Sequence, residues 1–264
     1  MADQELRYRS GGKRLPSVMQ NENFINIEER EKDSAIYRIM SVERLFDVFE
    51  NKKLTLVRPK LWDDPFENYI LSGRFYFYGD VASIGYREKF YGQCWTLNEE
   101  TDAMWRIYAP DKNGVKVKST IRKLFNSLWN TRMIPDCQDR ECFVGKVIYA
   151  DKTEIGDVYS KFQNNTELLL DRSMKAQALT LLIKREAFSH EREVRLIYYD
   201  MQRECNGDFF RYELNPLIFF EEIIFDPRMA VGEYERLREK LSRQFNYSNV
   251  RQSDLYQPFD YPAT

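Results

Sequence analysis

Short apolar stretches bounded by polar turns dominate the pattern of hydrophobic and polar positions along the chain. Stretches of about four to eight residues that are rich in aromatic and β-branched side chains are typical of strands. The pattern predicts strands at 35–40, 54–57, 91–96, 115–117, 142–149, 188–199, 209–214, 223–225 and 250–255, and a hairpin-like piece at 74–79.

Apolar residues at helical spacing are less frequent. Val42, Leu45, Phe46 and Phe49 form one apolar stripe after Ser41, whose hydroxyl can cap the helix. Further helices are predicted at 102–108, at 120–129, in the long segment after 149 and at 234–244. Because strands outnumber long helices and do not alternate with them regularly, we predict an α+β fold with a mainly antiparallel or mixed sheet and peripheral helices.

The start of the chain differs from the rest. Residues 1–33 are polar and show little apolar periodicity, so we expect a flexible or loosely docked N-terminal arm there. Residues 34–264 are predicted to form a single α+β domain.

The charge balance offers no long-range electrostatic attraction for anionic partners, although a local basic patch stays open. The 264 residues include 40 basic and 42 acidic ones, so the net charge of −2 gives no long-range attraction for nucleic acid or an anionic membrane. No apolar run approaches the length of a membrane span, and the first residues lack the apolar segment of a signal peptide. We therefore expect a soluble, cytoplasmic protein without a membrane partner, whose four cysteines stay reduced.

The available motifs narrow the chemistry. Cys137 and Cys142 lack a second cysteine or histidine pair, so no structural zinc is expected. Any Ser-His or Cys-His nucleophile would have to use the single histidine, His190. The sequence has no Walker loop, no Gly-x-Gly-x-x-Gly element and no His-Glu-x-x-His motif, which disfavours P-loop kinases, simple Rossmann dehydrogenases and zincins. Carboxylate, tyrosine, lysine and arginine side chains remain as the main catalytic candidates.

The stretch 188–199 (FSHEREVRLIYY) begins with charges and ends in apolar and aromatic residues. Side chains alternate along a strand, so Glu191, Glu193 and Arg195 are predicted to share one face, with the carboxylates about 7 Å apart along it. Arg195 would keep at least one carboxylate ionised. One carboxylate could then stabilise a developing positive charge while the other positions or deprotonates a nucleophile. The structural alternative is a solvated strand face with a Glu-Arg pair.

The acidic loop before residue 68 offers a second site. Asp63, Asp64 and Glu67 could supply oxygen ligands for magnesium or calcium. Alternatively, an aspartate caps the turn, Pro65 stiffens it and Phe66 packs in the core.

Two aromatic residues form a third candidate. Trp105 and Tyr108 are three positions apart on one predicted helical face and could stack on a base or a nicotinamide ring. Such a pair can equally belong to the core.

Five motifs in order carry a family resemblance: YRIMSVERLFDVFENKKLTLVRPKLWDDPFE, CWT, MWRIYAPDKNGVKV, GKVIYAD and FSHEREVRLI. Together they resemble a bacterial family known as domain of unknown function 2971, over about residues 35 to 255. The chain departs from the family pattern at Asp63, where asparagine is usual, and at Asp226, where glycine is usual.

The layout of that family is similar to that of ADP-ribosyltransferases of the Arg-Ser-Glu type, which implies a split sheet of the same kind. By this resemblance Arg38 would hold a phosphate or ribose of NAD, Thr96 would support the nicotinamide ribose, Glu193 would be the catalytic glutamate and Glu191 would orient the acceptor. Trp105 and Tyr108 would then lie on the NAD side.

The resemblance also implies a reaction. NAD would be the substrate, and its nicotinamide–ribose bond would break with oxocarbenium character, which an adjacent carboxylate stabilises without a metal. ADP-ribose would pass to a macromolecular acceptor, either protein or nucleic acid, as in an effector or toxin.

Two other functions stay open. A metal-dependent phosphodiesterase or nuclease would use Asp63, Asp64, Glu67 and the late glutamates, with Lys184 near the phosphate. A non-enzymatic binding module would have a purely structural Glu-x-Glu-x-Arg face.

Overall fold

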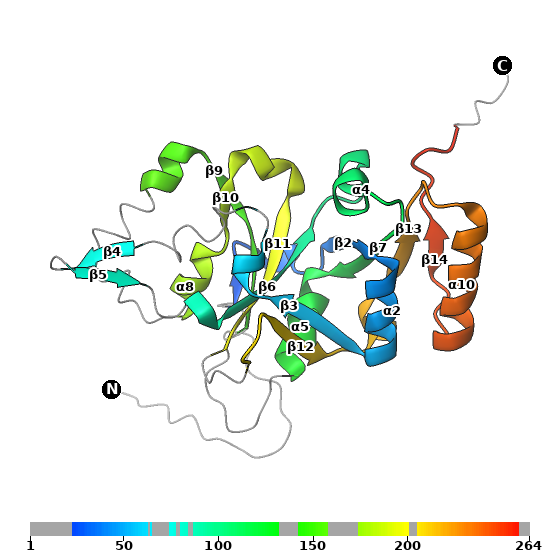
Figure 1. The fold of residues 1–264 in the computed structure, drawn as a ribbon, viewed down its shortest axis with the longest axis horizontal. Coiled ribbons are helices and arrows are strands. Elements are labelled where there is room, and N and C mark those ends of the chain that lie inside the picture. The colour runs from blue at the N-terminus through cyan, green and yellow to red at the C-terminus, as the bar shows by residue number, and fades with distance from the viewer. Residues whose placement is uncertain are drawn as a thin grey trace, which may run out of the picture.

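The structure is a computed structural model and describes residues 23–62, 64, 74–77, 80–83, 87–131, 142–157, 174–200 and 205–258. Its centre is a ten-stranded mixed sheet with the order β1-β8-β11-β6-β2-β7-β13-β14, to which β3 and β12 are added beside β6 (Figure 1). The predicted fold class is confirmed. The strands of this sheet are β1 (Phe24–Ile25), β2 (Ala35–Ser41), β3 (Lys53–Val57), β6 (Phe90–Thr96), β7 (Gly114–Thr120), β8 (Cys142–Lys146), β11 (Glu193–Tyr199), β12 (Phe209–Glu213), β13 (Glu222–Phe225) and β14 (Val250–Gln252).

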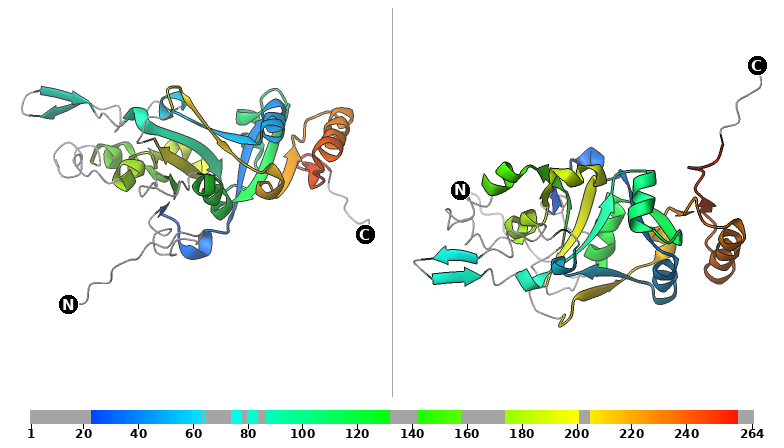
Figure 2. Two further views of the ribbon diagram at one scale, coloured as in Figure 1. Left: turned by 90° about the horizontal axis from the view of Figure 1, so that it is seen from below. Right: turned by 45° about the horizontal axis from the view of Figure 1, so that its top comes forward.

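Two smaller sheets accompany the main one. Strands β9 (Ile148–Ala150) and β10 (Ile183–Arg185) pair in parallel, and β4 (Arg74–Phe77) and β5 (Asp80–Ser83) form a hairpin. The hairpin and helix α10 lie at opposite ends of the molecule (Figures 1 and 2).

The helices are α2 (Val42–Asn51), α4 (Asp102–Tyr108), α5 (Ile121–Thr131), α8 (Met174–Thr180), α9 (Pro216–Phe219) and α10 (Val231–Phe245), with 3₁₀ turns η1 (Glu29–Glu31), η2 (Pro59–Leu61), η3 (Arg87–Lys89) and η4 (Glu186–Glu191). Within the described ranges, no helix is both long and apolar enough to cross a bilayer.

Helix α2 begins where the sequence predicts. The backbone N–H of Arg44 donates to the Ser41 hydroxyl at 3.3 Å, so the predicted N-cap is confirmed. The apolar stripe of this helix, including Leu45 and Phe49, is buried in the main core. Because α2 follows directly on β2, the packing of the helix also holds the C-terminal end of β2 in place.

Strand β11 is buried on both faces. Val194 and Leu196 pack in the main core, whereas Ile197 packs with Leu181 in a second cluster on the other face. The predicted alternation of side chains is therefore confirmed from Glu193 onward. A strand covered on both faces gives its polar side chains little solvent, so each of them needs a partner inside the protein.

The sheet divides beside β6. Strand β11 pairs with β6 along its whole length, from Glu193 opposite Thr96 onward. On the other edge of β6, β2 pairs through Tyr37 opposite Thr96 and β3 pairs through Val57 opposite Gly92. A Cβ atom on Gly92 would lie 2.6 Å from Cζ2 of Trp62, so this close approach requires glycine. Strands β2 and β6 thus meet at one end and leave a space between them further along.

Two boundaries differ from the sequence prediction. Residues 23–33 of the expected arm are docked, because Phe24 and Ile25 pair with β8 and are buried. The strand expected at 188–199 begins only at Glu193, because the preceding residues form η4 and Arg192 adopts a left-handed conformation with φ of 44°. Residues 1–22 and most of the predicted helical segment after 157 lie outside the described residues.

Candidate active site

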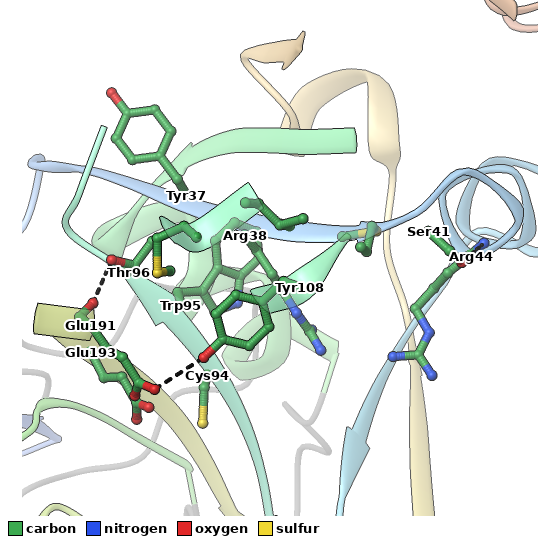
Figure 3. A pocket seen from close by; sticks show the side chains of 13 residues that line it. Tyr37, Arg38, Ser41, Arg44, Cys94, Trp95, Thr96, Tyr108, Glu191 and Glu193 are labelled. Atoms are coloured by element: carbon green, nitrogen blue, oxygen red, sulfur yellow. Dashed lines mark hydrogen bonds between the residues drawn. The ribbon is translucent and has the colours of Figure 1, made fainter. Parts of the chain in front are cut away.

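A pocket of about 430 Å³ lies where β2 and β6 separate (Figure 3). Its walls come from β2, the first turn of α2, the end of β6, helix α4 and the junction between η4 and β11. This volume is within the range of small-molecule sites. The pocket therefore depends directly on the division of the sheet.

Two glutamates form one end of the pocket. Nζ of Lys184 donates to Oε1 of Glu193 at 2.8 Å and also binds Oε2 of Glu191. Nε of Arg195 donates to Oε2 of Glu193 at 2.6 Å, and the Tyr108 hydroxyl donates to Oε1 of Glu191 at 3.2 Å. All four carboxylate oxygens thus have a partner. The two carboxylates are close neighbours, although Glu191 lies on η4 and not on the strand.

The backbone of Glu193 is also fixed. Its N–H donates to the Tyr149 hydroxyl at 2.8 Å, and its carbonyl accepts from the N–H of Val147 at 3.0 Å. Both partners belong to the segment around β9. The catalytic candidate is therefore held through its side chain and through its main chain.

The two glutamates differ in acidity. Burial raises the pKa of Glu193, but the charge of Arg195 and hydrogen bonds with Glu191 and Lys184 outweigh it and hold this pKa well below its usual range. For Glu191, burial and the contact with Glu193 outweigh Lys184 and raise the pKa to about 7. At neutral pH Glu193 is ionised, whereas Glu191 can take up a proton.

The opposite side of the pocket is cationic. Arg38 projects from β2 into the pocket, and its side chain makes no hydrogen bond or ion pair with any residue that the structure describes. Burial lowers the pKa of Arg38 to about 10, so it stays charged at neutral pH. Arg44, from the first turn of α2, adds a second positive charge to the pocket. Its side chain also has no partner among the described residues. Two charges without counterions favour an anionic ligand.

The structure brings together most of the residues that the sequence singles out. Arg38, Thr96, Tyr108, Glu191 and Glu193 all line the pocket. These residues come from five elements, β2, β6, α4, η4 and β11, of which only η4 and β11 are neighbours in the sequence.

Trp105 lies elsewhere. It is fully buried in a small cluster with Ala109 and Ile224, and its indole N–H donates to Oε1 of Glu100 at 2.7 Å. Trp105 therefore supports helix α4 from behind, while Tyr108 one turn later faces the pocket.

Thr96 has backbone contacts. Its hydroxyl donates to the carbonyl of Glu191 at 2.5 Å and accepts from the N–H of Asn98 at 3.0 Å. Thr96 thus holds the η4 end at the pocket, and a role in supporting a ribose stays a prediction.

Sequence reasoning missed some residues of the pocket. Arg44 and Cys94 line it, and Lys184 and Tyr149 support the glutamates from behind. For Lys184 the sequence indicates only a role near a phosphate. The position of Arg44 three residues after the predicted cap Ser41 was a usable signal, because the first turn of a helix that follows a site strand faces the same space.

The acidic loop does not form a metal site in the described residues. Oδ1 and Oδ2 of Asp64 accept from Arg185 at 2.9 and 3.2 Å. Asp63 and Glu67 lie outside the described residues. In the described part of the chain, no group of three or more histidine, cysteine, aspartate or glutamate residues is arranged to hold a metal ion.

Comparison with known proteins identifies a family segment. Residues 104–196 match the family model described as "Protein of unknown function (DUF2971)". The resemblance to this family that the sequence predicts is confirmed over residues 104–196, whereas its predicted extent over about residues 35 to 255 stays a prediction. The segment that matches DUF2971 contains Tyr108, Glu191 and Glu193, whereas Arg38 lies before it. No curated protein matches the chain.

Solved structures of one protein resemble the fold over most of its length. "Thermus sp. 2.9 DarT in complex with NAD+" is 10% identical with a TM-score of 0.37, covering 86% of this chain and 98% of that chain. The same Thermus sp. 2.9 protein in complex with ADP-ribosylated ssDNA is 10% identical with a TM-score of 0.39, covering 86% of this chain and 96% of that chain.

The raised pKa of Glu191 predicts a pH dependence of stability. Between its usual value of 4.5 and about 7, the folded protein binds more protons than the unfolded chain at this residue. The free energy of unfolding contributed by Glu191 therefore falls as pH rises through this window. Glu191→Gln removes the titration, so urea unfolding should show the variant gaining stability relative to wild type from pH 5 to pH 7.5.

The control for this titration is Glu213→Gln, at an exposed position on β12. Its stability difference from wild type should stay constant over the same pH range. A constant difference for Glu191→Gln as well would contradict the raised pKa.

Proposed function

We propose that this protein binds NAD in the pocket between β2 and β6, cleaves the nicotinamide–ribose bond and transfers ADP-ribose to an acceptor. The observation that carries the proposal is the charge pattern of one pocket. The guanidinium of Arg38, which has no partner among the described residues, lies on one side, and the buried carboxylates of Glu191 and Glu193 lie at the other. NAD has the matching pattern, with an anionic diphosphate in its middle and a cationic nicotinamide ring at one end. Complementary charges of this kind fix the orientation of a ligand.

The cationic side is assigned to the diphosphate. Arg38 can donate several hydrogen bonds to phosphate oxygens, and Arg44 adds charge at the N-terminal end of α2. The pocket lining also includes the aromatic residues Tyr37, Trp95 and Tyr108. Trp95 is held by a hydrogen bond of 2.7 Å from its indole N–H to Oε1 of Gln93.

The carboxylate end is assigned to the reacting ribose. When the C1′–N bond breaks, its electron pair leaves with the nicotinamide nitrogen, which becomes neutral, and positive charge develops on C1′ and the ring oxygen of the ribose. An ionised carboxylate held beside this position stabilises the charge without having to move. The depressed pKa of Glu193 keeps that carboxylate ionised.

The acceptor is assigned to the side of Glu191. Its nucleophilic atom bonds to C1′ and loses a proton, which a neighbouring base can take. A carboxylate with a raised pKa is a stronger base than an ordinary one, and the pKa of Glu191 lies near neutral pH. We propose that this acceptor is a macromolecule, protein or nucleic acid, that approaches over the partly exposed Tyr108.

Isothermal titration calorimetry with NAD tests the binding step. NAD should bind the wild-type protein, and ADP-ribose should bind as well because it keeps the diphosphate. Nicotinamide alone should bind far more weakly because it offers the arginines no anion. Absence of heat with both NAD and ADP-ribose would refute the assignment of the cationic side.

A further inference from the structure

The small parallel sheet β9/β10 stands behind the glutamate pair. Lys184 on β10 and Tyr149 on β9 are partners in its register. The two strands are also joined by the backbone N–H of Ile148, which donates to the carbonyl of Leu182 at 2.7 Å. Two residues at the same level of this sheet therefore both reach toward Glu193.

Their contacts are different and complementary. Lys184 is only 6% exposed and binds both carboxylates, while Tyr149 accepts the backbone N–H of Glu193 at 2.8 Å. Phe188 covers the ammonium group, with Nζ 4.6 Å from the ring centroid. An ammonium group that is buried between two carboxylates and covered by a ring has few alternative positions.

We propose that β9 and β10 form a positioning unit for the catalytic pair, in which Lys184 fixes the spacing and the charge of the two carboxylates and Tyr149 fixes the backbone of Glu193. The catalytic consequence rests on the proposed function, whereas the positioning itself can be measured without NAD. Neither residue is expected to touch the reacting atoms.

Charge balance gives the physical reason. When both glutamates are ionised, their two negative charges are balanced by two cations, Lys184 and Arg195. Removing one cation leaves a buried carboxylate without compensation, which is costly, so protons would bind in its place. Among the described residues, the hydroxyls of Tyr108 from α4 and Tyr149 from β9 also face the pair. Tyrosine is uncharged at neutral pH, and burial raises the pKa of both residues further.

The test is a pH titration of the glutamate side-chain carboxyl carbons by NMR, with ¹³C-labelled glutamate. Glu191→Gln and Glu193→Gln assign the two signals. In Lys184→Met both midpoints should rise, by about one to three pH units, as expected for the loss of a neighbouring opposite charge. Lys184→Arg, which keeps the charge, should restore most of the shift.

The double variant Lys184→Met with Glu191→Gln covers the case in which Lys184→Met does not fold. It removes one negative and one positive charge, so it should fold, and Glu193 should keep a low midpoint beside Arg195. Failure of the double variant to fold would contradict a role in charge compensation. Midpoints in folded Lys184→Met that coincide with those of wild type would overturn the proposal.

Tyr149→Phe tests the backbone contact separately. Loss of the acceptor should speed hydrogen exchange of the Glu193 amide by about tenfold or more, as expected for the loss of one hydrogen bond. An unchanged exchange rate would refute the role of Tyr149.

These outcomes are separable from the proposed function. If the midpoints shift but wild type does not cleave NAD, the positioning unit stands and the assigned reaction fails. If wild type cleaves NAD, the pH profile of kcat in Lys184→Met should move upward together with the midpoints, whereas a purely structural role would lower kcat at all pH values alike.

Discussion

Glu193→Gln is expected to lower kcat for nicotinamide release by about 10²- to 10³-fold, the usual cost of removing one preorganised electrostatic contact to a transition state. The amide keeps the size of the side chain but loses the charge that, in the proposed reaction, stabilises the oxocarbenium-like ribose. The KM for NAD should change little, because the diphosphate contacts at Arg38 are untouched. Steady-state kinetics with chromatographic detection of nicotinamide measures both quantities.

Two further variants make this result specific. Glu193→Asp keeps the charge, but its side chain is one methylene group shorter, so the carboxylate lies further from the proposed ribose position. Its kcat should therefore fall between those of wild type and Glu193→Gln. Glu222→Gln, on β13 and paired with Arg251 away from the pocket, should leave kcat unchanged. Circular dichroism must show that each variant is folded, because Glu193→Gln also leaves the buried Arg195 without its ionised partner. A folded Glu193→Gln protein with wild-type turnover would contradict the role of this glutamate.

Arg38→Met is expected to weaken NAD binding by about 10- to 100-fold, corresponding to about 1.5–3 kcal/mol for hydrogen bonds with a charged group. Methionine keeps much of the apolar volume of the arginine stem, so the variant tests the charge and its hydrogen bonds. Calorimetry with NAD and with ADP-ribose should show parallel losses, because both ligands carry the diphosphate.

Arg44→Met and Arg211→Met complete this series. Arg44 is exposed at the edge of the pocket, so its loss should weaken binding less than the loss of Arg38, and added salt should reduce the difference. Arg211 is exposed on β12 and outside the pocket lining, so its replacement should have no effect. Equal affinities for wild type and Arg38→Met would place the diphosphate elsewhere.

The parts of the fold that depend on local patterns could be predicted from the sequence. The cap at Ser41, the stripe of α2 and the alternation from Glu193 to Ile197 each follow from the spacing of neighbouring residues. The same alternation placed Glu191 on the strand, which is wrong, because Arg192 takes a left-handed conformation that ends η4. A positive φ at an arginine has no clear signature in the local sequence.

The parts of the site that depend on tertiary contacts could not be predicted in this way. Lys184 reaches the glutamates because β10 pairs with β9, and Asp64 is 121 positions from its partner Arg185. Trp105 and Tyr108 share a helix, but packing against Ile224 buries the first and leaves the second at the pocket. The tertiary packing of α4 therefore determines which of these two aromatic residues, Trp105 or Tyr108, can contact a ligand in the pocket.

Product analysis after incubation of the wild-type protein with NAD tests the central claim most directly. Mass spectrometry with and without a chelator separates the two ways in which NAD can be cut. If the protein acts as proposed, nicotinamide appears together with ADP-ribose, free or bound to an acceptor, at the same rate in the presence of chelator. Nicotinamide mononucleotide together with AMP, formed only without chelator, would contradict it and indicate a metal-dependent phosphodiesterase.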